Sequence, residues 1–172
     1  INKKLNKLKS KLLKNYDFKP SFISISVTHS CCLKCKQCDL WKLPKDDKLS
    51  TEEIKKTIFE LKSWLGSFML NISGGEPFMR NDIVELVRYS TSLGVPVTIT
   101  TNGVLLNKKL SNGLVEAGLA NINISIDGFE NIHDFTRGKG IYKKVMNNLR
   151  YLNKVKKNTN VCFFELKDED II

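Results

Sequence analysis

The chain has 172 residues, of which 41% are hydrophobic and 27% are charged, and its formal net charge is +10. This composition is typical of one folded soluble domain and excludes a disordered chain. No apolar run approaches the roughly 20 residues that a membrane-spanning helix needs, so a membrane span is excluded as well.

The first 20 residues form a basic segment that we expect to be a unit of its own. They contain seven lysines and one aspartate, and leucines recur among them at helical spacing. This pattern predicts a short amphipathic helix over residues 2–15, packed on a domain that spans residues 21–172. The rest of the chain is nearly balanced in charge, so we expect no nucleic-acid partner. The segment lacks the continuous apolar core of a signal peptide, and the expected location is the cytoplasm.

Short apolar-rich strands alternate with longer helical patterns along the remainder of the chain. We expect strands at residues 22–28, 68–73, 95–101, 121–127 and about 160–166. Between them we expect helices at residues 51–65, 82–93, 107–117 and 141–157. The first helix has a capping box formed by Ser50 and Glu53 at its start, and Gly66 ends it. This alternation predicts an α/β fold with a parallel sheet.

Four of these strands alternate small polar residues with aliphatic ones. Parallel strands that helices cover on both faces are normally apolar throughout, so one face of this sheet must line something polar. The pattern favours a partial (β/α) TIM-like barrel whose lumen holds a polar ligand. An antiparallel sheet with one wet face is the alternative. The polar positions are Ser24, Ser26, Thr28, Asn71, Ser73, Thr98, Thr100, Asn121, Asn123, Ser125 and Asp127.

Four of the five cysteines follow the first strand directly. Cys31, Cys35 and Cys38 form the pattern CxxxCxxC, and three thiolates on one loop suit an iron-sulfur cluster. Zinc is the rival metal, with Cys32 or His29 as its fourth ligand. Thiols clustered in this way indicate metal ligands in a reducing compartment and not a disulfide scaffold.

Three further motifs each stand at the end of an expected strand. Residues 73–77 read SGGEP, residues 100–103 read TTNG, and residues 125–128 read SIDG. His133, Asp134, Arg137 and Gly138 follow the last of them. Together with CxxxCxxC, these motifs resemble the radical S-adenosylmethionine (SAM) enzyme superfamily over about residues 20–166.

The resemblance implies a 4Fe-4S cluster on Cys31, Cys35 and Cys38, with the fourth iron left to bind SAM. Reductive cleavage of SAM would give a 5'-deoxyadenosyl radical that takes hydrogen from a substrate. Arg137 is expected to pair with the methionyl carboxylate, since its guanidinium binds carboxylates bidentately. Asp127 would accept from a hydroxyl or cap the following loop. The full set of expected SAM-binding residues is Gly74, Gly75, Glu76, Thr100, Ser125 and Arg137.

Several residues stand apart from this pattern. Gln37 occupies a position where the family usually has an aromatic residue beside the adenine, and Cys32 one where Asn is frequent. Cys162, in the fifth strand, is expected to be a small buried hydrophobe. We expect His29 and His133 to be surface or hydrogen-bonding residues and not a second metal site.

The length allows about five of the six strand-helix units of the family's partial barrel, so we expect a fragment of a larger protein. The implied partners are an electron donor such as flavodoxin or ferredoxin and an unidentified substrate. Maturation of a peptide or protein is the leading hypothesis for that substrate, and small-molecule cofactor biosynthesis is the second. A zinc- or cluster-binding module without catalysis is the alternative from a different class.

Overall fold

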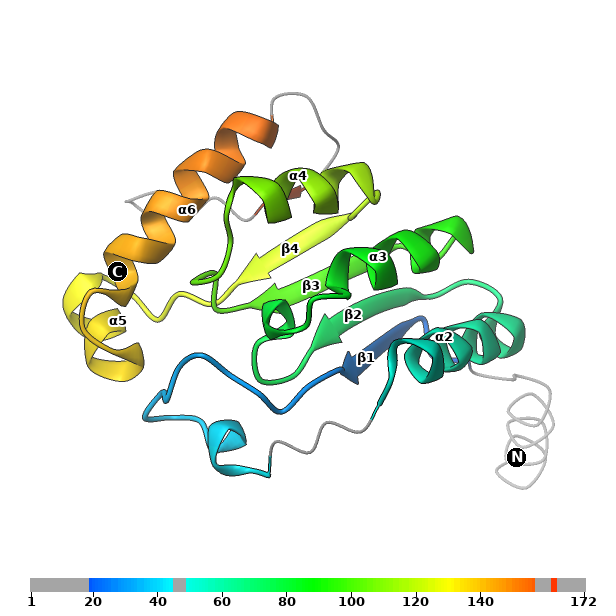
Figure 1. Cartoon of the computed structure of the whole chain (residues 1–172), viewed down its shortest axis with the longest axis horizontal. Coiled ribbons are helices and arrows are strands. Elements are labelled where there is room, and N and C mark those ends of the chain that lie inside the picture. Colours follow the sequence, from blue (N-terminus) through cyan, green and yellow to red (C-terminus); the bar gives the residue numbers. More distant parts are fainter. Residues whose placement is uncertain (1–18, 45–48, 157–161, 164–172) are drawn as a thin grey trace, which may run out of the picture.

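A five-stranded parallel sheet with its strands in chain order forms the centre of the molecule (Figure 1). The computed structural model describes residues 19–44, 49–156 and 162–163. All four neighbouring pairs of strands are parallel, so the predicted α/β class is confirmed and the antiparallel alternative is wrong. The strands are β1 (Phe22–Ser26), β2 (Met69–Ser73), β3 (Val97–Thr101), β4 (Asn121–Ile124) and β5 (Cys162–Phe163).

The four predicted helices are present, each within about one residue of its expected bounds. They are α2 (Thr51–Leu65), α3 (Ile83–Ser92), α4 (Lys108–Glu116) and α6 (Ile141–Lys156). None of the helices in the described part of the chain is long and apolar enough to cross a membrane. The helix expected over residues 2–15 lies outside the described residues. The expected separate unit over residues 1–20 is therefore not tested by the structure.

Three short elements were not expected from the sequence. They are the 3₁₀ turns η1 (Leu40–Lys42) and η2 (Pro77–Met79) and the helix α5 (Glu130–Arg137). His133 is the one residue that α5 buries, while Phe135 is 67% exposed. The apolar residues of this short helix, Ile132 and Phe135, are both exposed, so α5 lacks the apolar stripe packed on the core from which sequence periodicity predicts buried helices.

The aliphatic face of the sheet packs against the helices in one continuous core. Its fully buried members come from the strands, such as Leu70 and Ile99, and from the helices, such as Ile58 and Leu86. Because α2, α3, α4 and α6 all contribute to this core, the helices cover the aliphatic face and leave the opposite face of the sheet to the lumen side.

Hydrogen bonds join the small polar side chains of that opposite face across the strands. The Nδ2 atom of Asn71 donates to the Oγ atom of Ser24 at 3.0 Å, and the Oγ1 atom of Thr100 donates to the Oδ1 atom of Asn71 at 3.0 Å. At the amino ends of the first two strands, the same face carries Phe22 and Met69, which are paired in register and exposed. The predicted polar face therefore exists and is apolar at one end.

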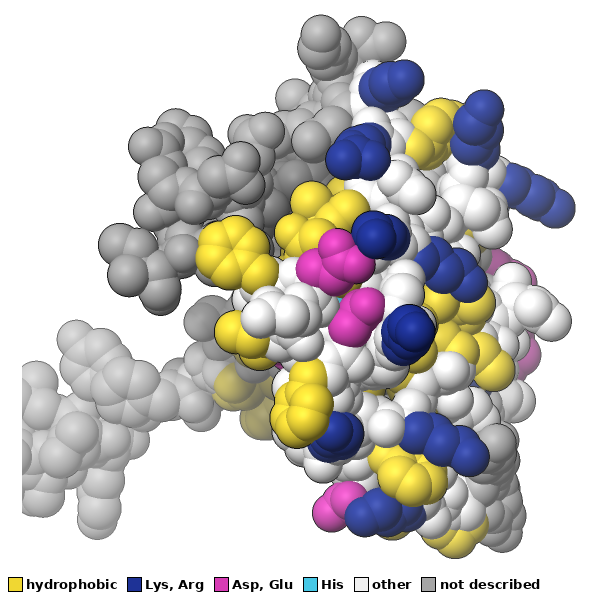
Figure 2. Space-filling view, turned by 90° about the vertical axis from the view of Figure 1, so that its left-hand side faces the viewer, with side chains coloured by type: hydrophobic (Ala, Val, Ile, Leu, Met, Phe, Trp, Pro, Cys, Tyr) yellow, Lys and Arg dark blue, Asp and Glu magenta, His cyan; other side chains and the backbone are white. Residues whose placement is uncertain are grey.

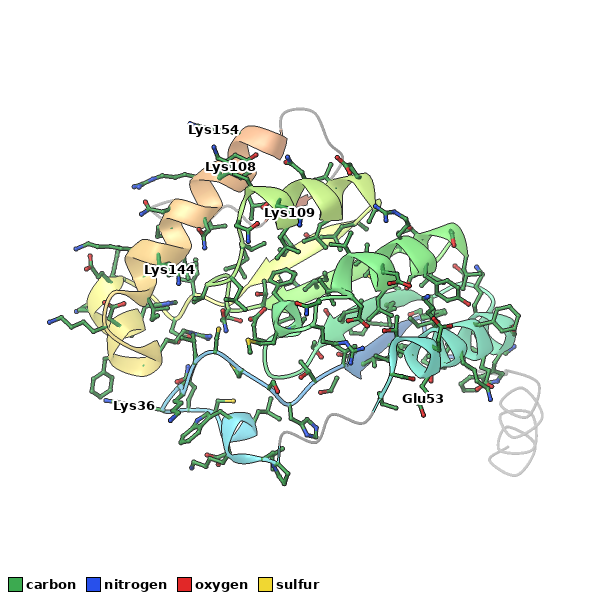
Figure 3. All side chains as sticks on the ribbon, in the orientation of Figure 1. Lys36, Glu53, Lys108, Lys109, Lys144 and Lys154 are labelled. Carbon is green, nitrogen blue, oxygen red and sulfur yellow. The ribbon has the colours of Figure 1, made fainter. Side chains whose placement is uncertain are left out.

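The capping box of α2 gives a direct test of local stability. The amide of Ser50 donates to Glu53 at 2.8 Å and the amide of Glu53 donates to the Ser50 hydroxyl at 3.2 Å; Figure 3 labels Glu53 at the start of this helix. We expect Ser50→Ala to lower the free energy of unfolding by about 1 kcal/mol, because the Glu53 amide loses its acceptor and the Glu53 carboxylate loses the Ser50 hydroxyl. Urea unfolding measures this change. Ser63→Ala, in the same helix, should cost clearly less, and equal losses would contradict the role of the cap.

Candidate functional site

The motif-bearing segments meet at the carboxyl edge of the sheet. We call residues 27–39 the cysteine loop. In Figure 1 the arrowheads of the strands point toward the side where this loop and α5 lie. Parallel strands place all their carboxyl ends at the same edge, so the segments that follow β1 to β4 converge there. These segments carry the residues that were assigned to the cluster or to SAM, except Thr100, which lies near the end of β3 itself.

Main-chain hydrogen bonds join the cysteine loop to the glycine-rich segment after β2. The amide of Gly75 donates to the carbonyl of Thr28 at 2.8 Å, and the amide of Glu76 donates to the carbonyl of Ser30 at 2.8 Å. A Cβ atom on Gly74 would collide with the carbonyl oxygen of Thr28, and one on Gly75 with that of Ser30. The cysteine loop itself therefore requires glycine at both positions, a requirement that the sequence analysis missed.

Glu76 is a fully buried carboxylate that joins the ends of β2 and β3. Its Oε1 atom accepts from the Thr101 hydroxyl at 2.7 Å and from the Phe78 amide at 3.1 Å. Its Oε2 atom accepts from the Asn102 amide at 2.8 Å. Burial raises the pKa of the Glu76 carboxyl, and these three donors oppose that shift. In this structure Glu76 is a brace between two motif segments.

The three cysteines of the CxxxCxxC pattern lie against a small apolar cluster beside the main core. Cys35 is buried, Cys31 and Cys38 are partly buried, and all three contact a cluster that includes Val104 and Val145. Cys32 is exposed, and its sulfur lies 3.5 Å from the Nδ2 atom of Asn102. The structure thus separates Cys32 from the other three by its exposure.

The surroundings of Cys31 favour its thiolate form. The neighbouring Cys32 thiol is the main cause that lowers the pKa of Cys31 to about 6, and the amide of Leu33 acts in the same direction. That amide lies 3.5 Å from the Cys31 sulfur. Burial raises the pKa of Cys35, and the nearby Arg137 opposes this effect. Soft metal ligation uses thiolates, so these surroundings suit Cys31 as a metal ligand.

A single-ion site is not formed by the residues that the structure describes. No three of their His, Cys, Asp and Glu side chains converge closely enough to hold one metal ion. Zinc in structural sites has four ligands around one centre. The cysteines of the described residues are therefore not drawn together around one centre.

Asp127 accepts hydrogen bonds from two separate parts of the site. Arg137 donates to it through Nε at 2.7 Å and Nη2 at 2.8 Å, and the Thr136 hydroxyl donates at 2.8 Å. From the cysteine loop, the Nε2 atom of Gln37 donates at 2.9 Å. Arg137 is the main cause that lowers the pKa of Asp127 to about 2. Asp127 thus holds Arg137 and accepts from the hydroxyl of Thr136, and its expected role toward a hydroxyl of the ligand stays a prediction.

The Arg137 guanidinium uses one edge for Asp127 and keeps the other open. Its Nη1 atom has no hydrogen-bond partner among the described residues, although the side chain is only 13% exposed. The charge of Arg137 also interacts with Cys35 and Cys31. The structure therefore brings Arg137 close to the cysteines, with three of its five N–H donors left over from the pair with Asp127.

The other expected SAM-binding residues lie at the same edge. The hydroxyl of Thr100 donates to Asn71, and the amide of Ser125 donates to the carbonyl of Thr101 at 3.0 Å. Ser125 is partly buried. The residues are assembled around the end of the polar face, and their roles toward SAM stay a prediction.

His133 is fully buried, so a surface position is wrong for it, while its hydrogen-bonding role is confirmed. Its Nδ1 atom accepts from the Asp127 amide at 3.3 Å, and its Nε2 atom has no partner within the described structure. Burial lowers the pKa of His133. His29 is exposed, and the two histidines do not form a metal site with the described residues.

Basic and hydrophobic side chains are interspersed over this end of the molecule (Figure 2). Lys36, labelled in Figure 3, lies over the Phe135 ring with its Nζ atom 3.3 Å from the ring centroid. The amide of Lys36 also donates to the carbonyl of Thr136 at 2.9 Å. These contacts fasten the cysteine loop to α5.

Comparison with known proteins decides the family. The family model described as the radical SAM superfamily matches residues 25–172. The chain belongs to the radical SAM superfamily. This membership confirms the resemblance of the four motifs, and curated relatives named as synthases and cyclases indicate a family of enzymes.

Two curated relatives of this radical SAM chain have different named activities. It is 36% identical over 146 residues to Fe-coproporphyrin III synthase of Methanosarcina barkeri, covering 83% of the chain and 36% of the relative. It is 38% identical over 113 residues to PqqA peptide cyclase of Rhodopseudomonas palustris, covering 64% of the chain and 30% of the relative. The chain therefore spans about a third of the length of these relatives.

The fold of the radical SAM chain is similar to that of SuiB of Streptococcus suis, solved with bound S-adenosylmethionine. The TM-score is 0.74 at 22% identity, and the match covers 98% of this chain and 40% of SuiB. At this identity the likeness shows the fold alone. It agrees with the open parallel sheet of a partial barrel.

Proposed function

We propose that the protein binds a 4Fe-4S cluster through Cys31, Cys35 and Cys38 and uses it to cleave SAM. When bound, such a cluster supplies the single electron that converts SAM to methionine and a 5'-deoxyadenosyl radical for hydrogen abstraction. One observation carries the proposal: three cysteines, the glycine-rich segment and Arg137 meet at one edge of the sheet in a radical SAM chain. Arg137 pairs with Asp127 through only one edge of its guanidinium.

The donor set fits an iron-sulfur cluster by its chemistry. Three free thiols stand on one loop, and a fourth is exposed beside them. The small apolar cluster with Val104 and Val145 keeps water from their inner side. A low-dielectric wall of this kind, together with amides near the sulfurs, is what tunes such clusters in proteins.

Arg137 is the residue that we assign to the methionyl carboxylate. A guanidinium offers two bidentate edges, and Asp127 occupies only the one formed by Nε and Nη2. The second edge, formed by Nη1 and Nη2, matches the two oxygens of a carboxylate. A cation that is mostly buried and incompletely paired gains most from an anionic ligand, because little water screens the interaction.

The remaining SAM contacts are assigned to the polar edge around Arg137. Gly74, Gly75 and Glu76 present main chain at the methionyl end, and Thr100 and Ser125 present hydroxyls. Since Glu76 is fully buried and saturated by three donors, we assign it a bracing role and not a direct charge contact. Gln37 takes no part in stacking on adenine, because its amide is held by Asp127.

For the substrate we propose a peptide or protein that undergoes radical maturation. This hypothesis is supported by the relative named as a peptide cyclase. The relative named as a porphyrin synthase supports small-molecule cofactor biosynthesis as the second candidate. An external one-electron donor such as flavodoxin or ferredoxin supplies the electron in either case.

Anaerobic reconstitution with iron and sulfide tests the proposal. We expect about four iron atoms and four sulfides per chain, with broad visible absorbance, and a change in that spectrum on addition of SAM. Stoichiometric zinc without sulfide would contradict the cluster, and an unchanged spectrum with SAM would contradict SAM binding next to it.

A further inference from the structure

The contacts of Asp127 divide the Arg137 guanidinium into a held edge and an open edge. Asp127 takes the Nε and Nη2 hydrogens in a bidentate pair at 2.7 and 2.8 Å. This pair fixes the plane of the guanidinium and therefore the direction of the remaining donors. The carboxylate is itself oriented by the Thr136 hydroxyl at 2.8 Å.

The cysteine loop is bound to the same carboxylate, that of Asp127, through Gln37. The Nε2 atom of Gln37 donates to the Oδ2 atom of Asp127 at 2.9 Å, although the two residues are 90 positions apart in the chain. Gln37 lies directly before Cys38, and the amide of Lys36 donates to Thr136 in α5. The loop that carries the thiols and the helix that carries the arginine are thus held by one carboxylate.

We propose that Asp127 is a positioning residue that sets Arg137 for a carboxylate ligand, and that Gln37 couples the cysteine loop to this arrangement. The inference rests on the proposed function, because the carboxylate is that of SAM. Gln37 stands at a position where the family usually has an aromatic residue, so this chain uses a hydrogen bond where packing would otherwise serve.

Asp127 has two opposing effects on ligand binding. Its negative charge weakens the attraction between Arg137 and a second carboxylate. Its bidentate hydrogen bonds, in contrast, order the Arg137 side chain, which has many rotamers, before the ligand binds. Ordering dominates here, since the remaining N–H donors must meet a planar carboxylate in one orientation. Removing the bidentate pair between Asp127 and Arg137 therefore weakens ligand binding.

Calorimetric titration of the anaerobically reconstituted protein with SAM tests the role of Asp127. Asp127→Asn keeps the size of the side chain but removes its charge and one acceptor, and we expect the dissociation constant for SAM to rise about tenfold. For Gln37→Leu we expect a rise of about threefold. Iron content per chain and melting temperature are measured for each variant, so that a loss of fold is separated from a loss of positioning.

Asp82→Asn is the matched control. Asp82 forms the same bidentate pair with Arg80, at 2.8 and 2.6 Å, and accepts from the Thr51 hydroxyl, but it lies at the start of α3. We expect this variant to lose stability and to keep the SAM affinity of the unmodified protein. Unchanged SAM affinity in Asp127→Asn, or an equal loss in Asp82→Asn, would overturn the positioning role.

Hydrogen exchange of the metal-free protein tests the coupling without SAM. We expect Gln37→Leu to speed amide exchange in α5, because the cysteine loop no longer holds Asp127. Unaltered exchange there would overturn the coupling. If the unmodified protein bound neither cluster nor SAM, the proposed function and the role of Asp127 toward SAM would both fail, whereas the exchange result would still decide the coupling.

Discussion

Replacing Cys31, Cys35 or Cys38 by alanine, one at a time, is expected to abolish cluster binding and SAM cleavage. Each thiolate would hold one iron, and a cluster that loses one of its three protein ligands keeps only two; Cys32, the other thiol of the loop, is exposed and lies against Asn102. Iron and sulfide per chain, measured after anaerobic reconstitution, should fall from about four of each to background. Circular dichroism checks that the fold is kept.

Cys32→Ala is the control for these three variants. Cys32 is exposed, and its sulfur contacts Asn102, which follows β3, and interacts with the neighbouring Cys31 thiol. We expect this variant to bind a full cluster. Loss of the cluster in Cys32→Ala, combined with retention in any of the other three, would show that the ligands are assigned wrongly.

Glu76→Ala is expected to be the most damaging single substitution for stability. It leaves the amides of Phe78 and Asn102 and the hydroxyl of Thr101 without their buried acceptor and opens a cavity between β2 and β3. Unpaired buried donors cost about 1 to 3 kcal/mol each, so we expect a loss of at least about 3 kcal/mol. Urea unfolding of the metal-free protein measures it.

Two further variants bracket the effect of Glu76. Glu76→Gln keeps the volume and one acceptor oxygen, and should cost less than the alanine substitution. Glu60→Ala removes an exposed carboxylate from α2, whose contact with Lys56 is 4.0 Å long, and should change stability by no more than about 0.5 kcal/mol. A Glu76→Ala protein as stable as Glu60→Ala would contradict the bracing role.

Regular features of the fold were predictable because they are local. The capping box of Ser50 and Glu53 needs only four consecutive residues, and it forms as expected. The alternation of polar and aliphatic residues in the strands has a period of two, and it correctly separated the core face from the polar face. Each of these signals is complete within one element of the chain.

The contacts within the site were not predictable, since they join residues that are distant in the sequence. Gln37 meets Asp127 across 90 positions, and no periodicity reports such a pair. The burial of His133 was missed because α5 is short, its apolar residues Ile132 and Phe135 are exposed, and the residue that it buries is polar. The need for glycine at position 75 arises from the main chain of Ser30 and His29, which only the folded structure brings there.

The main-chain bonds between the cysteine loop and the glycine-rich segment have a consequence for conformational entropy. Gly75 and Glu76 hold Thr28 and Ser30 in place, so the base of the loop is ordered as part of folding. Part of the entropy cost of ordering the cysteine loop is then met before any metal arrives. Metal affinity becomes tied to the integrity of the fold, and we expect cluster loss and thermal unfolding to occur in a single cooperative transition.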